Sequence, residues 1–134
     1  MIYADSGILI RLIEGADRLR LPIESRLREI RSRDKTLITS RLSRLECRCK
    51  PLREGREYVL SLYDGFFDTE EVLLKEIDAA VIEQATEFRA GFGLKASDAI
   101  HVATAILAGV SEFWTADRDF LRCPELKVEL FDAV

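Results

Sequence analysis

The sequence predicts a three-layer α/β/α sandwich around a central, mostly parallel sheet of about five strands. Short apolar runs alternate with segments of helical periodicity, which is typical of βαβ units with parallel strands. The chain has 134 residues, 48% hydrophobic and 33% charged, as expected for an ordinary globular protein. We find no linker, repeat or low-complexity segment, so we expect a single domain over residues 1–134.

The first part of the chain predicts two strands, each followed by helices. Ile2–Ala4 and Thr36–Thr39 are short runs that suit buried strands. The segment SGILIRLIEG predicts a helix that ends near Gly15. Pro22 is expected to open the next helix, which runs to about Ser32.

The middle of the chain predicts two helices and a third strand. Helical spacing resumes from Ser40, and Pro51 is expected to kink or end this helix. The segment EGREYVLSLYDGFF predicts another helix, with a turn at Asp64–Gly65. The segment EEVLLKEI, with imperfect alternation of apolar and polar residues, is the third strand.

The last part of the chain adds two helices and two strands. A helix is predicted over Ala79–Arg89, with Asp78 as its N-cap and the sequence GFG as the following loop. The next helix covers Ser97–Leu107 and stops at Gly109. The remaining strands are Glu112–Ala116 and Lys127–Phe131.

Composition excludes several classes of protein and site. No apolar run reaches the roughly 18 residues of a membrane span, and the start MIYADSGILI lacks the features of a signal peptide, so we expect a cytoplasmic protein without a membrane partner. Three cysteines, Cys47, Cys49 and Cys123, do not suggest a disulfide framework or a zinc site, and we expect them to be reduced. A single histidine excludes a metal site of several histidines, and no glycine-rich phosphate loop is present.

Charge is distributed unevenly along the chain. The net charge is −4, but residues 11–56 carry 14 Lys and Arg against 7 Asp and Glu, whereas residues 57–134 carry 6 against 16. Such an asymmetry suggests an anionic partner for the basic half. Arg41, Arg44 and Arg48 can form one stripe on a helix that contacts RNA; alternatively, they form a solvated face or pair with an acidic segment of a partner.

Four acidic residues fall where an open parallel sheet places its functional site, outside the carboxyl ends of the strands. Asp5 follows the first strand and Asp117 the fourth, Glu46 lies in the helix after the second strand, and Asp98 lies in the first turn of a helix. Each has an ordinary explanation: a helix cap for Asp5, complementarity to the helix dipole for Asp98, an Asx-turn for Asp117, and simple surface exposure for Glu46.

Taken together, the four acids predict a metal site. Carboxylates that meet at adjacent strand ends repel one another, and a divalent cation would neutralise them. Ligation by oxygen alone suits Mg²⁺ or Mn²⁺, and Mg²⁺ takes only one or two carboxylates directly and keeps several waters. A metal of this kind lowers the pKa of its bound water and polarises a phosphoryl oxygen, which is the chemistry of phosphodiester hydrolysis.

The sequence resembles the PIN-domain ribonucleases, and among them the VapC-type toxins of toxin–antitoxin pairs. YADSGILI is similar to the family's opening strand and first acid, and ITSRLSRLECRCKPLREG to the block with the second acid. ASDAIHVATAILAGVSEFWTADRDF resembles the most specific block. The resemblance covers nearly the whole chain.

The resemblance implies an acidic site, a reaction and partners. Asp5, Glu46, Asp98 and Asp117 would be the catalytic acids that bind Mg²⁺ or Mn²⁺. Ser6, Thr115 and Asp119 would be accessory residues. The activity implied is endonucleolytic cleavage of RNA by a homodimeric toxin that a cognate antitoxin silences. His101, one helical turn after Asp98, is expected to hydrogen-bond to neighbours rather than to the metal.

Two other functions stay open at this point. One is a housekeeping PIN nuclease that processes ribosomal or transfer RNA without an antitoxin. The other is a catalytically silent module on the same fold that binds RNA or protein. An intact set of four acids argues against the silent module.

Overall fold

The structure, a computed structural model, describes residues 1–132 and contains every strand that the sequence predicts. The strands are β1 (Ile2–Ala4), β2 (Leu37–Ser40), β3 (Leu73–Lys75), β4 (Glu112–Thr115) and β5 (Val128–Leu130). The helices are α1 (Ser6–Glu14), α2 (Asp17–Ser32), α3 (Leu42–Arg53), α4 (Glu57–Phe67), α5 (Ala79–Phe92), α6 (Ala96–Ala108) and a short 3₁₀ helix, η1 (Arg118–Arg122).

The five strands form one parallel sheet in the order β3-β2-β1-β4-β5. Tyr3 of β1 lies beside Ile38 of β2 on one side and Phe113 of β4 on the other. The chain moves outward from β1 through β2 to β3, then returns to place β4 against the free side of β1. The order therefore reverses between β1 and β4, and such a reversal opens a crevice at the carboxyl ends of the two strands.

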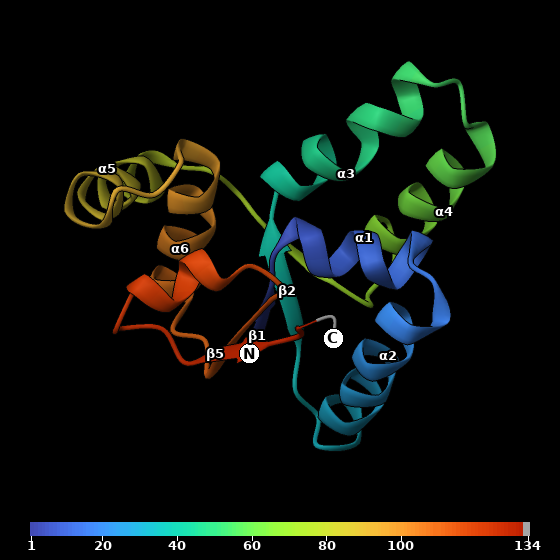
Figure 1. The fold of residues 1–134 in the computed structure, drawn as a ribbon, viewed down its shortest axis with the longest axis horizontal. Coiled ribbons are helices and arrows are strands. Elements are labelled where there is room, and N and C mark those ends of the chain that lie inside the picture. The colour runs from blue at the N-terminus through green and yellow to red at the C-terminus, as the bar shows by residue number, and fades with distance from the viewer. Residues whose placement is uncertain (133–134) are drawn as a thin grey trace.

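Helices cover both faces of the sheet, so the predicted α/β/α sandwich is confirmed. In Figure 1, α5 and α6 lie on one side of the strands and α1 to α4 on the other. Side chains alternate along a strand, so Ile2 and Ala4 of β1 pack in the core with α1, α2 and α4, whereas Tyr3 packs in the core with α5 and α6. Burial on both faces explains why the central strand β1 is continuously apolar.

The predicted start of one helix in the first half of the chain was wrong. The helix α2 begins at Asp17, five residues before Pro22, so Pro22 lies inside it. A proline inside a helix removes one backbone hydrogen bond, and the burial of Ile23, Leu27 and Ile30 on the same helix offsets this loss. The helix α3 likewise continues past Pro51 to Arg53.

The turn expected at Asp64–Gly65 is absent, because α4 runs through both residues to Phe67. Glycine inside a helix costs about 1 kcal/mol relative to alanine, but Phe66 and Phe67 are buried by this last helical turn. The GFG loop was also misplaced, since α5 continues to Phe92. The left-handed backbone that ends a helix falls at Gly93 there and at Gly109 after α6.

Candidate active site

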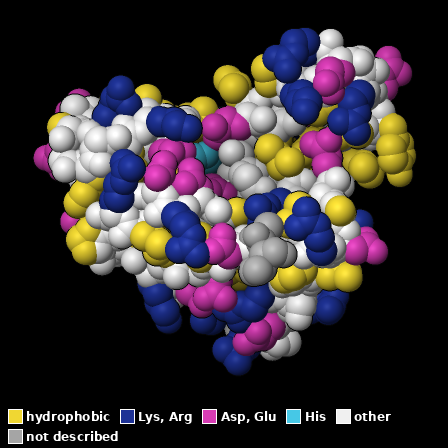
Figure 2. Space-filling view, in the orientation of Figure 1, with side chains coloured by type: hydrophobic (Ala, Val, Ile, Leu, Met, Phe, Trp, Pro, Cys, Tyr) yellow, Lys and Arg dark blue, Asp and Glu magenta, His cyan; other side chains and the backbone are white. Residues whose placement is uncertain are grey.

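Three of the four predicted acids line a single cavity at the crevice between β1 and β4. Asp5 directly follows β1, Asp117 lies two residues after β4, and Asp98 is in the first turn of α6. Figure 2 shows acidic side chains beside a hollow between the α5–α6 side and the α1–α4 side of the molecule. The chain's one histidine, in cyan, lies at the base of this hollow. The cavity measures about 580 Å³ and is lined by Asp5, Ser6, Gly7, Arg11, Asp98, Ala116, Asp117, Arg118, Phe120 and Asp132.

Asp5 is both a helix cap and a cavity acid. Its Oδ1 accepts the backbone N–H of Ile8 at 3.0 Å, which caps α1, and its Oδ2 accepts the hydroxyl of Thr115 at 2.5 Å. The side chain is almost fully buried, and this burial raises the pKa of Asp5 above its ordinary value, although the Thr115 hydrogen bond opposes the shift. The capping explanation is therefore correct but incomplete, since a cap needs neither burial nor a second donor.

Thr115 also orients the second strand-end acid. Its hydroxyl oxygen accepts the backbone N–H of Asp117 at 3.0 Å, and Asp117 Oδ1 in turn accepts the N–H of Asp119 at 2.9 Å. One buried hydroxyl thus links the carboxylate of Asp5 to the backbone of Asp117. Asp119 pairs with Arg122 at 3.4 Å and does not line the cavity.

The fold places the Asp98 carboxylate where its ionised form is disfavoured. Burial and the negative charge of Asp117 raise its pKa above the ordinary value, against the opposing charge of Lys95. If stabilisation by the helix dipole dominated, the pKa of an acid in a first helical turn would instead be lowered. Among residues 1–132, Asp5, Asp98 and Asp117 take part in no ion pair, whereas nearby Arg118 pairs with Asp132.

Glu46 lies beside the cavity instead of lining it. Its Oε1 is 2.6 Å from Nε2 of His101, so a contact between α3 and α6 holds the side chain. Burial acts to raise the pKa of Glu46, but hydrogen bonds from His101 and Ser6 hold it below the ordinary value. Glu46 is therefore not a simple surface residue, and the expected hydrogen-bonded role of His101 is confirmed.

The chemistry of the cavity acids suits a hard divalent cation, because all the donors are oxygens. Among residues 1–132, however, no three Asp, Glu, His or Cys side chains already surround one point as ligands. A cation with the coordination habits of Mg²⁺ needs only one or two direct carboxylates. The donor set thus fits such an ion, while the assignment of individual ligands stays a prediction.

Two arginines that the sequence analysis missed line the same cavity, Arg11 and Arg118. Arg11 donates to the backbone carbonyl of Phe131 at 2.7 Å, and Arg118 pairs with Asp132. Arg118 lies within the motif TADRDF, between the two acids, and this position was the signal available for finding it. Arg11 gave no comparable signal, because only the fold brings α1 beside the end of the chain.

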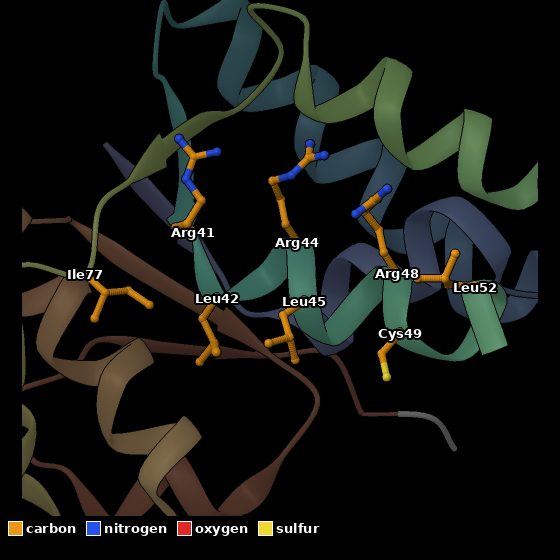
Figure 3. Close-up of a pocket in the computed structure, with 8 residues that line it drawn as sticks. All are labelled: Arg41, Leu42, Arg44, Leu45, Arg48, Cys49, Leu52 and Ile77. Carbon is orange, nitrogen blue, oxygen red and sulfur yellow. The ribbon is translucent and has the colours of Figure 1, made fainter.

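The three arginines predicted to contact RNA lie elsewhere, along α3. Figure 3 shows Arg41, Arg44 and Arg48 pointing to one side of the helix, and Leu42, Leu45 and Cys49 pointing to the other. Each is paired with an acid of its own chain. These pairs are Arg41–Glu76 at 2.5 Å, Arg44–Asp64 at 3.4 Å and Arg48–Asp64 at 2.9 Å.

The comparisons with known proteins agree with this fold. Residues 2–126 match the PIN domain. The chain belongs to the PIN-domain family. No curated protein sequence matches it. The PIN fold is thus established from the sequence match as well as from the sheet order.

Two solved structures share the fold of this PIN domain. The VapBC2 complex of Rickettsia felis bound to a promoter DNA fragment contains a chain with a TM-score of 0.79 and 19% identity, over 97% of this chain and 98% of that one. A toxin–antitoxin complex from Klebsiella pneumoniae contains a chain with a TM-score of 0.70 and 20% identity, over the full length of both. Within the described residues, no helix of this PIN domain is long and apolar enough to cross a membrane.

Proposed function

We propose that residues 1–134 form a Mg²⁺- or Mn²⁺-dependent endoribonuclease that acts in the cytoplasm as the toxin of a type II toxin–antitoxin pair. One observation carries the proposal: Asp5, Asp98 and Asp117 of a PIN domain line one cavity without an ion pair among the described residues. Acids whose pKa values are raised by burial and by one another are candidates for a functional site.

Each acid would have a distinct part in the reaction. Asp5, held by Thr115 and the N–H of Ile8, offers the most fixed carboxylate to a cation. Asp98 and Asp117, which line the same cavity, would hold the cation or its waters, and Glu46 would act from the edge beside Ser6. When bound, the cation would lower the pKa of a water and stabilise the leaving oxygen of a phosphodiester.

Arginines at the cavity would bring the RNA backbone to these acids. A cluster of carboxylates repels phosphate, so substrate binding requires nearby cations. Arg11 and Arg118 line the cavity itself, and a phosphate would compete with Asp132 for Arg118. RNA contact by Arg41, Arg44 and Arg48 remains part of the proposal, in second place because those side chains are paired within the chain.

Protein partners are the second part of the proposal. The two structural neighbours are toxin–antitoxin assemblies, which supports a cognate antitoxin for this chain and favours a toxin over a housekeeping nuclease. The outward face of α3 carries apolar side chains on an open surface (Figure 3), with Leu45 and Leu52 65% and 64% exposed. Exposed apolar stripes of this kind suit protein contacts, including a homodimer.

The test is cleavage of total RNA by the purified protein, followed by sequencing of the new RNA ends. Cleavage is expected with Mg²⁺ or Mn²⁺, and not with a chelator or with the Asp98→Asn variant. Expression in growing cells should arrest growth, and Asp5→Ala should abolish the arrest. Metal-independent binding of RNA without cleavage would contradict the proposal and would favour a silent binding module.

A further inference from the structure

Glu46 is held in place by a chain of hydrogen bonds that begins in the centre of the sheet. The hydroxyl of Tyr3 lies 2.6 Å from Nδ1 of His101, and Nε2 of His101 lies 2.6 Å from Oε1 of Glu46. Tyr3 and His101 are almost completely buried. The contact crosses from α6 to α3, which lie on opposite sides of the sheet in Figure 1.

The direction of each hydrogen bond follows from its neighbours. Burial, the largest influence, keeps the pKa of Tyr3 well above its ordinary value, so its hydroxyl carries a proton. The Tyr3 oxygen accepts the backbone N–H of Ser40 at 3.2 Å, which leaves that proton free to point to Nδ1 of His101. The ionised carboxylate of Glu46 can only accept, so Nε2 must be the donor toward it.

Packing leaves the rings of Tyr3 and His101 little freedom to move. The Tyr3 ring stacks on Phe113 with centroids 5.0 Å apart and meets the His101 imidazole edge-on at 5.8 Å. A glutamate side chain alone has several rotatable bonds and loses entropy when it is fixed. A donor that cannot itself move reduces the number of positions that the carboxylate adopts.

We propose that Tyr3 and His101 are positioning residues, which hold Glu46 at the edge of the acidic cavity through hydrogen bonds in which Nε2 of His101 is the donor. The expected effect on catalysis rests on the proposed nuclease function. The hydrogen bonds among Tyr3, His101 and Glu46 do not depend on that function. Groups that hydrogen-bond to functional carboxylates typically change activity or metal affinity by about 10- to 100-fold when removed.

The first experiment identifies the protonated nitrogen directly. His101 is the only histidine in the sequence, so protein labelled with ¹⁵N-histidine gives one pair of ring nitrogens to assign. The spectrum is recorded without metal or RNA, at a pH well above the ordinary histidine pKa of about 6.5. We expect a protonated Nε2 and an unprotonated Nδ1. A protonated Nδ1, with or without a protonated Nε2, would overturn the proposal.

The second experiment compares two buried tyrosines. Tyr3→Phe removes the hydroxyl at Nδ1 and retains the ring, and Tyr63→Phe is the matched control, because Tyr63 is equally buried and donates to Glu14 at 2.5 Å. We expect Tyr3→Phe to speed exchange of the Nε2 proton with water and to lower kcat by about 10- to 100-fold with little change in KM. Tyr63→Phe should change neither, whatever its effect on melting temperature. Equal effects of the two variants would overturn the positioning role.

Replacement of His101 gives a rescue test. His101→Gln can place an amide N–H near the position of Nε2, whereas His101→Leu fills the space without a donor. We expect the glutamine variant to retain more kcat than the leucine variant, and equal losses would contradict the role of the donor. If the wild type cleaves no RNA, the proposed function fails, but the nitrogen spectrum still decides the hydrogen-bond chain.

Discussion

Beside α3, the acidic side chains of Glu76 and Asp64 are paired with arginines, whereas among residues 1–132 the three predicted acids in the cavity at the ends of β1 and β4 take part in no ion pair. Glu76 shows the first case, because the hydrogen bond and charge of Arg41 hold its pKa below the ordinary value. Asp98 shows the second, because burial and Asp117 raise its pKa. The protein thus has the means to neutralise acids but leaves them without partners at the crevice in the sheet.

This difference separates acids that stabilise the fold from acids kept for a ligand. An ion pair on a helix surface contributes little, but it does not oppose folding. Carboxylates brought together without a cation destabilise the protein, and such strain is typical of functional sites. The cavity acids are therefore the ones to vary for activity, and the α3–α4 pairs are the matched controls.

The largest expected effect is on catalysis. Asp98→Asn keeps the shape of the side chain and removes its charge. We expect RNA cleavage to fall by more than about 100-fold, which exceeds the loss typical for a residue that only hydrogen-bonds to a metal ligand. Asp64→Asn, the matched change within an Arg pair, should leave cleavage near the wild-type rate. Initial rates on a defined RNA substrate measure both. Comparable losses in the two variants would remove the distinction between the two regions.

A smaller effect is expected for substrate binding. Arg118→Gln removes a cation from the cavity wall, and Arg41→Gln removes one from α3. We expect Arg118→Gln to raise KM more than Arg41→Gln and to reduce the slope of log affinity against log salt by about 1, as for one lost phosphate contact. Filter binding to a catalytically inactive Asp98→Asn background at several salt concentrations gives this slope. A larger change for Arg41→Gln would place the RNA on α3.

The pH dependence of stability should differ between the regions. Because the folded-state pKa of Asp98 is raised, its contribution is most favourable below the unfolded value of about 3.9 and is lost as pH rises through the folded value. Metal-free Asp98→Asn should therefore melt above the wild type near neutral pH, and the difference should vanish as pH falls toward 4. Thermal denaturation at a series of pH values measures it. A variant that melts lower at neutral pH would instead support a purely helix-stabilising role.

The smallest effect is expected for the paired acids. Asp64→Asn removes the acceptor that Arg44 and Arg48 share, and partly exposed pairs contribute from a few tenths to about 1 kcal/mol. We expect a slightly lower unfolding free energy in urea, which decreases further at low salt relative to the wild type. A stabilised Asp64→Asn variant would show that this region, too, carries unfavourable charge.

The comparison also shows what the sequence could predict. The strands, Gly109 at the end of α6, and three acids of the cavity were accessible because each has a local signal: an apolar run, a helix stop, a position just after a strand for Asp5 and Asp117, and a first helical turn for Asp98. The sheet order then brings Asp5 and Asp117 together, since β1 and β4 are neighbours.

The features that the sequence did not predict depend on contacts between distant segments. Glu46 and His101 are 55 residues apart, and nothing near Glu46 indicates its partner. The pairing of Arg44 and Arg48 with Asp64 depends on how α3 and α4 pack. Pro22 and Gly65 disfavour a helix locally, but they lie inside helices because the burial of large side chains nearby stabilises those helices more. Tertiary packing decided all of these.

The most direct test of the central claim is Mn²⁺ binding to the purified protein, measured by calorimetric titration or by the loss of the free-ion electron paramagnetic resonance signal. We predict saturable binding to the wild type and to Asp64→Asn, and an affinity at least about tenfold weaker for Asp98→Asn, because that variant removes a carboxylate of the cavity. Equal Mn²⁺ affinity in all three proteins, or none in the wild type, would contradict a shared cation at the ends of β1 and β4.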